Sequence, residues 1–162
     1  MKRYHLWLLA AVLAALAVRL HNLTYHSFWF DEAVSVYWAR QSAPRIIEVG
    51  LTLVEDRLPP LYYLALKGWS GLVGFSETGL RGLSVLVGVL LAPVLARLAA
   101  ALFNRRAAVL AGWLAALNPF LIWYAQEARM YGLAVLLSAL TVWAFLRMVL
   151  SSRTASDPPP AP

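Results

Sequence analysis

The 162-residue chain contains no cysteine, and only 14% of its residues are charged. The lack of cysteine excludes disulfide bonds, thiolate nucleophiles and metal sites with cysteine ligands. Acidic residues are the scarcer of the two signs, with 8 Asp and Glu against 14 Lys and Arg. Soluble domains carry roughly 25% charged residues, so this chain has too few to cover an ordinary water-soluble fold.

Apolar residues dominate instead, since 61% of the chain is hydrophobic and 7 residues are tryptophan. In a small soluble domain most residues lie near the surface, so it cannot bury this large a fraction of apolar residues. Intrinsic disorder is also excluded, because it requires low hydrophobicity. The net charge of +6 comes from basic residues scattered singly at the ends of apolar runs, where they anchor helices rather than bind nucleic acid. The composition therefore predicts a membrane protein with no nucleic-acid partner.

Four apolar segments predict an all-α, multi-pass fold with about four transmembrane helices, since a span needs about 20 apolar residues. The segments are residues 4–20, 80–103, 107–126 and 130–150. The first also has features of a signal peptide, but Arg19 and His21 stand where a small-residue cleavage site would be expected. Pro119 is expected to kink the third span.

The basic pair Arg105 and Arg106 lies in the short turn between the second and third spans. Cytoplasmic loops are enriched in Lys and Arg, so we expect this turn on the cytoplasmic side. Both termini then lie inside, and the loop of residues 21–79 lies on the extracytoplasmic face. Residues 1–150 are expected to form one transmembrane domain, and the Pro- and Ser-rich residues 151–162 a disordered cytoplasmic tail.

The outer loop contains three short segments with helical features, at residues 31–41, 44–54 and 59–73. The last begins with two prolines, which are favoured in a first helical turn. It is too short to cross a bilayer, and its Tyr, Trp and Lys content is typical of a helix in the membrane interface. We therefore expect interfacial helices in this loop rather than a fifth span.

Two adjacent carboxylates, Asp31 and Glu32, follow an aromatic triplet just after the first span. One interpretation is helix capping, in which Asp31 accepts backbone N–H bonds and Glu32 complements the helix dipole. The other is a general base at the membrane surface, where partial desolvation raises the pKa of a carboxylate. The sequence pattern leaves both interpretations open.

A second polar cluster stands where the third span gives way to the fourth. It comprises Gln126, Glu127, Arg129 and Tyr131. Ionisable groups at membrane depth are costly and are usually paired or functional. The cluster is therefore either part of a functional site or a Glu127–Arg129 ion pair that closes a tight turn.

Three further cations on the outer side, Arg57, Lys67 and Arg81, are candidates for binding a lipid phosphate by charge-assisted hydrogen bonds. The alternative is that each is an anchor whose charged end snorkels to the interface. His21 and His26 could in principle ligate a metal with a nearby carboxylate, but their spacing matches no helical face. We predict no metal site, and dependence on a divalent metal stays open.

Taken in order, these motifs resemble the N-terminal part of the GT-C glycosyltransferases, in particular the protein-mannosyltransferase, aminoarabinose-transferase and Rgt-like group. The matching stretches are Arg19-Leu20, Phe28-Trp29-Phe30-Asp31-Glu32-Ala33, Pro59-Pro60-Leu61-Tyr62-Tyr63, Leu80-Arg81-Gly82-Leu83-Ser84, Asn104-Arg105-Arg106-Ala107-Ala108, and Asn118-Pro119-Phe120 onward to Tyr131. The resemblance implies transfer of a sugar, with inversion, from a polyprenyl-phosphate carrier to an acceptor on the extracytoplasmic face. It also implies a multi-pass protein of a prokaryotic plasma (inner) membrane.

The resemblance implies roles for individual residues. Asp31, with Glu32 beside it, takes the acidic position of the first loop and acts as the base or orients the acceptor. Glu127, Gln126 and Arg129 take the second-loop cluster near the donor phosphate. Tyr131 and the outer cations Arg57, Lys67 and Arg81 complete the expected donor-binding set. The expected partners are membrane lipid and the lipid-linked sugar.

The chain departs from the family pattern in two respects. Family members usually have His before the two prolines, where this chain has Leu58 preceded by Arg57. They also have many more spans, so we expect this chain to be the N-terminal portion of a transferase, with the missing spans supplied by a second polypeptide. The alternative is a non-catalytic accessory membrane protein of the same ancestry.

Overall fold

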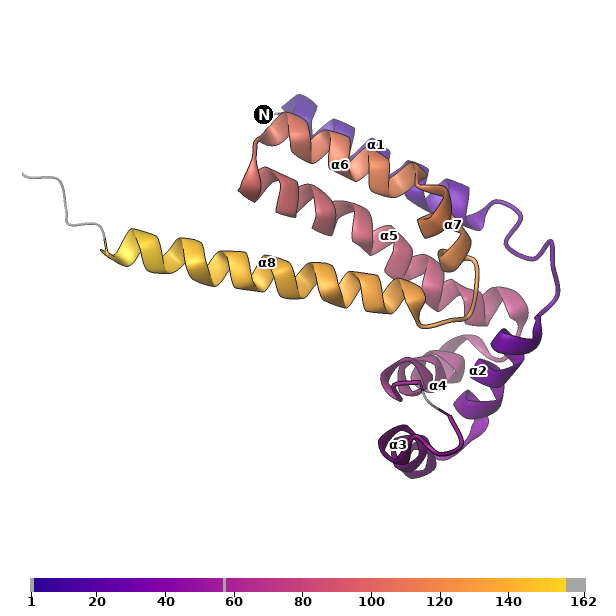
Figure 1. The fold of residues 1–162 in the computed structure, drawn as a ribbon. Coiled ribbons are helices and arrows are strands. Elements are labelled where there is room, and N and C mark those ends of the chain that lie inside the picture. Colours follow the sequence, from indigo (N-terminus) through magenta and orange to yellow (C-terminus); the bar gives the residue numbers. More distant parts are fainter. Residues whose placement is uncertain (1, 57, 157–162) are drawn as a thin grey trace, which may run out of the picture.

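The computed structural model describes residues 2–56 and 58–156, and this part of the chain is all-helical. The helices are α1 (Lys2–Leu20), α2 (Phe30–Arg40), α3 (Ala43–Thr52), α4 (Leu61–Val73), α5 (Glu77–Leu102), α6 (Arg105–Leu117), α7 (Pro119–Ala125) and α8 (Tyr131–Ser156). Figure 1 shows a bundle of long helices with a layer of short helices, α2 to α4, at one end. The predicted all-α class is confirmed.

Three helices in the described part of the chain are long and apolar enough to cross a membrane. They are Arg3–Leu20 of α1, Glu77–Leu102 and Tyr131–Val149 of α8. The pair α6 and α7 meets the same criterion together but is bent by 53° at its junction. Three of the four predicted spans therefore correspond to single helices, and the other corresponds to the bent α6–α7 pair, which makes four if that pair is one span. The kink expected at Pro119 is present.

The break between α6 and α7 follows from Asn118 and Pro119. Proline has no N–H, so the Ala115 carbonyl loses its helical partner. The Asn118 side chain accepts a backbone N–H at 3.1 Å and caps the start of α7. The fully buried guanidinium of Arg19 donates to the carbonyls of Ala115 and Ala116 at 3.0 and 2.9 Å. An arginine of α1 thus donates hydrogen bonds to the two carbonyls at the break.

Helix α5 is central in the bundle and packs against α1, α6 and α8. A core of small side chains lies where α1, α5 and α6 meet. It comprises Ala15, Ala92, Ala115 and Ala116. Small residues let helix backbones approach closely, as is typical inside membranes. Helix α8 contacts the other side of α5 through larger apolar residues, including Leu91 and Leu136.

The loop layer contains the short helices expected within residues 31–41, 44–54 and 59–73. Its core is aromatic and aliphatic and includes Trp38, Ile46, Tyr62, Leu66 and Leu80. Helix α4 has 13 residues and does not qualify as a span, in agreement with the predicted interfacial helix. The layer lies at the end of the bundle away from the N-terminus (Figure 1). Its extracytoplasmic location stays a prediction.

The C-terminal boundary differs from the prediction. Helix α8 continues to Ser156, so the expectation of disorder from residue 151 is wrong for residues 151–156. Residues 151–156 contain no proline or glycine to end the helix, and the first proline that follows is Pro158. The rest of the expected tail, residues 157–162, lies outside the described residues.

Candidate functional site

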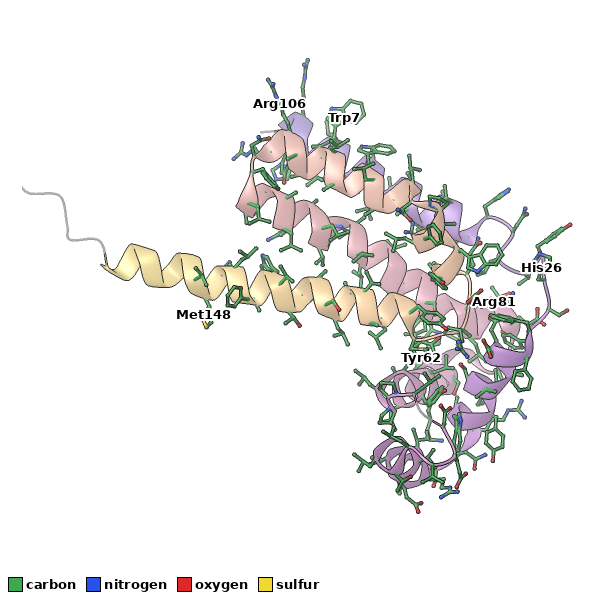
Figure 2. All side chains as sticks on the ribbon, viewed as in Figure 1. Trp7, His26, Tyr62, Arg81, Arg106 and Met148 are labelled. Atoms are coloured by element: carbon green, nitrogen blue, oxygen red, sulfur yellow. The ribbon has the colours of Figure 1, made fainter. Side chains whose placement is uncertain are left out.

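Most of the predicted site residues meet at one end of the bundle, where α1 ends, α2 and α5 begin, and a short turn joins α7 to α8. Figure 2 places Arg81 at this junction, with His26 on the chain that leads from α1 to α2. Residues far apart in the sequence are therefore brought to one place. They form two clusters, one around Glu32 and the other around Asp31.

A buried ion pair joins Glu32 of α2 to Arg81 of α5. The two side chains are 0% and 4% exposed, and Arg81 Nη2 lies 2.7 Å from Glu32 Oε2. Arg81 Nε donates to Glu32 Oε1 at 2.9 Å, and the Ala128 N–H donates to the same oxygen at 2.8 Å. Glu32 thereby links α2, α5 and the α7–α8 turn. Both of its oxygens accept hydrogen bonds from the protein, three in all.

Arg81 uses its remaining donors on backbone carbonyls of the α1–α2 connection. Nη1 donates to Leu23 and His26, both at 2.8 Å, and Nη2 donates to Ser27 at 3.4 Å. A guanidinium has five N–H donors, and with Glu32 included all five have an acceptor. The interpretation of Arg81 as a snorkelling anchor is therefore wrong, because it is buried and paired. In this arrangement it has no donor left for a phosphate.

The second cluster joins Asp31 to Arg129. Arg129 Nη1 donates to the Asp31 carbonyl at 3.0 Å, and Nη2 lies 3.6 Å from Asp31 Oδ2. Nη2 also donates to the Tyr131 hydroxyl at 3.2 Å. The Arg129 side chain is buried whereas the Asp31 side chain is 36% exposed. Asp31 is thus accessible from outside and held beside a cation.

These contacts decide two of the structural alternatives. The expected Glu127–Arg129 ion pair is wrong, because Arg129 pairs with Asp31 instead. The capping interpretation of Asp31 is also wrong, since Trp29 is the N-cap of α2 and that helix start has no side-chain cap hydrogen bond. Arg129 Nε is buried without a hydrogen-bond partner, so this guanidinium, unlike Arg81, retains unused donor capacity.

A pocket of about 470 Å³ lies on the Glu32 side of the site, within the size range of small-molecule sites. It is lined by Asn22, Leu23, His26, Ser27, Trp29, Glu32, Arg81, Trp123, Gln126 and Glu127. Four predicted site residues are among them. Asp31, Arg129 and Tyr131 are not, so the Asp31–Arg129 cluster is not part of the pocket lining.

Two residues of the α7–α8 turn differ in what they offer the pocket. Gln126 Nε2 donates to the carbonyls of His21 and Arg19 at 2.7 and 3.2 Å and so closes the end of α1. Burial raises the pKa of the Glu127 carboxyl, although a hydrogen bond from Trp123 opposes this. Glu127 is therefore more easily protonated than an exposed glutamate.

Two of the predicted cations are not part of this arrangement. Lys67 lies half-buried on α4 and forms no ion pair with any residue that the structure describes. Arg57 lies outside the described residues. In the parts of the chain that are described, no group of three His, Asp or Glu is placed to hold a metal ion.

Sequence reasoning missed three contributors to the site. Arg19 was not predicted as a site residue, yet its guanidinium donates to the carbonyls of Ala115 and Ala116 at the break between α6 and α7. Trp123 lines the pocket. Tyr63 donates to Asp56 Oδ2 at 2.7 Å, and burial raises the pKa of its hydroxyl. The only signal in the sequence was a large aromatic residue or an arginine near the end of a span. Such a residue does not indicate which group it will contact.

One family model matches the chain. It is described as dolichyl-phosphate-mannose-protein mannosyltransferase and matches residues 57–156. The matched part contains α4 to α8, with Arg81, Glu127 and Arg129, whereas Asp31 and Glu32 precede it. No curated protein and no solved structure matches the chain.

Proposed function

Because this chain belongs to the dolichyl-phosphate-mannose-protein mannosyltransferase family, we propose that it acts in the transfer of a sugar from a polyprenyl-phosphate carrier to an acceptor hydroxyl. The chain is a multi-pass membrane protein, because several of its helices are long and apolar enough to cross a membrane. The predicted resemblance to GT-C glycosyltransferases is confirmed over the matched residues. The family match favours a glycosyltransferase over a non-catalytic accessory protein.

The observation that carries the proposal is the pairing of Asp31 with Arg129 at the loop end of the bundle. A general base must come within hydrogen-bond reach of the proton that it removes. Asp31 is the more exposed of the two adjacent carboxylates. A cation suited to a phosphate lies next to it. Asp31 as the base and Arg129 as a contact for the leaving phosphate thus lie side by side.

In the proposed reaction the acceptor oxygen attacks the anomeric carbon of the carrier-linked sugar. The new carbon–oxygen bond forms as the bond from that carbon to the phosphate oxygen breaks. The acceptor proton passes to the Asp31 carboxylate, and the polyprenyl phosphate leaves with the electron pair of the broken bond. Arg129 stabilises the charge that develops on the phosphate, since donors aimed at developing charge are effective in a water-poor site.

Glu32 has a different role in this proposal. Arg81 and the Ala128 N–H occupy both of its oxygens, so it is a positioning residue rather than the base. By fixing the start of α2 against α5 it directs the neighbouring Asp31 toward Arg129. Tyr131 supports Arg129 from the other side.

The location belongs to the same proposal. We place the loop layer on the extracytoplasmic face of a prokaryotic plasma membrane, where a polyprenyl-phosphate-linked sugar is presented to acceptors. Membrane lipid and this donor are the proposed partners. A second polypeptide that packs on the exposed face of α8, which includes Val142 and Phe145, is the proposed protein partner.

The test is a transfer assay in proteoliposomes that contain the chain, the missing spans supplied in cis or by the proposed second polypeptide, and a polyprenyl-phosphate-linked sugar; the chain alone is expected to show no transfer. Asp31→Asn is expected to reduce transfer by about 10²-fold or more, because positioned bases contribute roughly 10²–10⁴-fold. The control is Glu48→Gln, which removes an exposed carboxylate of α3 paired with Arg45. Transfer that is equal in both variants would show that Asp31 is not the base.

A further inference from the structure

Arg19 is a fully buried cation near the end of the first span. It forms no ion pair with any residue that the structure describes. Its acceptors are instead the carbonyls of Ala15, Ala115 and Ala116. An ionisable side chain inside a span is costly and is a candidate for function, with backbone carbonyls among its usual partners. The proposed reaction assigns no step to Arg19, so its burial needs a separate explanation.

Two of these carbonyls lie where α6 ends. Ala115 and Ala116 belong to the last turn of α6, where the final carbonyls have no helical partner and carry the partial negative charge of the helix dipole. A cation is stabilised at such a place. Arg19 therefore ties α1 to the residues that immediately precede α7.

A second side chain connects the same two parts of the chain in the opposite direction. Gln126 directly follows α7, and its Nε2 donates to the carbonyls of Arg19 and His21 at 3.2 and 2.7 Å. The seven-residue α7 is thus held against α1 at both of its ends, by Arg19 before it and by Gln126 after it. We call these two residues the α1 clamp.

Gly88 of α5 makes room for the α1 clamp. A Cβ at Gly88 would lie 2.9 Å from Arg19 Nε and 2.7 Å from the Ala125 Cβ of α7. Carbon atoms in good contact are about 3.5–4.0 Å apart, so a side chain here would push both groups away from α5. Its absence lets the clamped segments lie directly on the central helix.

The residues after α7 make the contacts that join the α7–α8 turn to α2. The Ala128 N–H donates to Glu32 Oε1 at 2.8 Å, and Arg129 Nη1 donates to the Asp31 carbonyl at 3.0 Å. Only one residue separates Gln126 from Ala128. A displacement of α7 is therefore transmitted to both contacts.

We propose that Arg19, together with Gln126, is a positioning residue that fixes α7 against α1 and thereby holds Arg129 beside Asp31. The inference rests on the proposed function and adds to it a role for α1, which contains neither the base nor the phosphate contact. It also explains why a buried cation is paired with carbonyls rather than with a carboxylate. Its acceptors are the ends of the segments that it joins.

The first experiment measures whether the α1 clamp places α7. Because the chain has no cysteine, spin labels can be attached to Phe120→Cys on α7 and Tyr37→Cys on α2, whose native side chains are 72% and 56% exposed. Pulsed EPR on the chain in nanodiscs should give a narrow distance distribution, which broadens or shifts when Arg19→Met or Gln126→Met is added. The matched control, Arg97→Met, removes an exposed arginine of α5 and should leave the distribution unchanged.

The second experiment measures whether the α1 clamp acts through Arg129. Arg19→Met is expected to weaken binding of polyprenyl phosphate about fivefold, within the range found for coupled residues. Arg19→Lys keeps a cation with three donors and should retain most of the affinity. In the Arg129→Gln background, Arg19→Met should have no further effect, because the contact that it positions is already lost. A role in general stability alone would give the same loss in both backgrounds.

Two results would overturn the proposal. One is a label distance in Arg19→Met and Gln126→Met that equals that of the chain with native clamp residues. The other is a loss of phosphate affinity from Arg19→Met that is equal with and without Arg129. Circular dichroism verifies that each variant keeps its helices. Gln126→Met, which leaves the buried cation in place, decides the first experiment if Arg19→Met does not fold.

Failure of the proposed function has a different signature. Phosphate binding that is unaffected by Arg129→Gln would reject the phosphate contact. The label distances then decide the α1 clamp by themselves. A distribution altered by Arg19→Met but not by Arg97→Met upholds it, and one altered by neither rejects it.

Discussion

Replacing Glu32 with glutamine tests whether the buried ion pair holds the site together. The change keeps the shape of the side chain but leaves Arg81, which is 4% exposed, without its counter-ion. Breaking a buried pair by removing one partner costs about 3–5 kcal/mol, because the remaining charge is uncompensated. Three backbone carbonyls still accept from Arg81. We therefore expect a loss near the lower limit, about 3 kcal/mol.

The assay is thermal or SDS unfolding of the purified chain followed by helical circular dichroism. Glu48→Gln is the matched control, because it removes a carboxylate from an ion pair whose Glu48 side chain is 61% exposed, and exposed pairs contribute about 0–1 kcal/mol. Equal destabilisation by Glu32→Gln and Glu48→Gln would refute the reasoning.

Three other predictions address the phosphate, the packing and the topology. Arg129→Gln should weaken binding of polyprenyl phosphate by about one to two decades in a lipid-binding assay, since a hydrogen bond to a charged group contributes roughly 1.5–3 kcal/mol; unchanged affinity would leave it a structural cation. Gly88→Ala should lower the unfolding temperature, because its Cβ would lie 2.7 Å from a methyl of α7 and 2.9 Å from a buried guanidinium. Gly68→Ala, with nothing within 4 Å of its Cβ, should be neutral or stabilising, and the reverse ranking would contradict this packing. Reporter fusions at Phe75 and Arg105 should report outside and inside respectively, and the opposite pair would invert the proposed orientation.

The helices were largely predictable, because each depends on a pattern that is local in the sequence. The apolar runs mark the spans, and Pro119 marks the break in one of them. The end of α8 was missed, since the Ser- and Ala-containing residues after 150 resemble a tail by composition but continue the helix. Local patterns thus fix where helices exist better than where they end.

Partner choice was not predictable, because it depends on contacts between distant parts of the chain. Sequence adjacency suggested that Arg129 pairs with Glu127. In the structure Arg129 pairs with Asp31 of α2, 98 residues away. In the same way, the position of Arg81 at a span end indicated either a phosphate ligand or a snorkelling anchor. Its burial results from the α1–α2 connection folding over it, which no local pattern records.

The adjacency of Asp31 and Glu32 explains why one site contains both a committed and an accessible carboxylate. Neighbouring residues of a helix point about 100° apart, so the two side chains on the first turn of α2 meet different arginines. Arg81 has every donor occupied by Glu32 and carbonyls, whereas Arg129 retains an unpartnered Nε. On the proposed function an arriving phosphate competes with Asp31 for Arg129 and leaves the Glu32–Arg81 pair intact. Donor binding would then release the carboxylate that removes the acceptor proton, which favours an order in which the donor binds first.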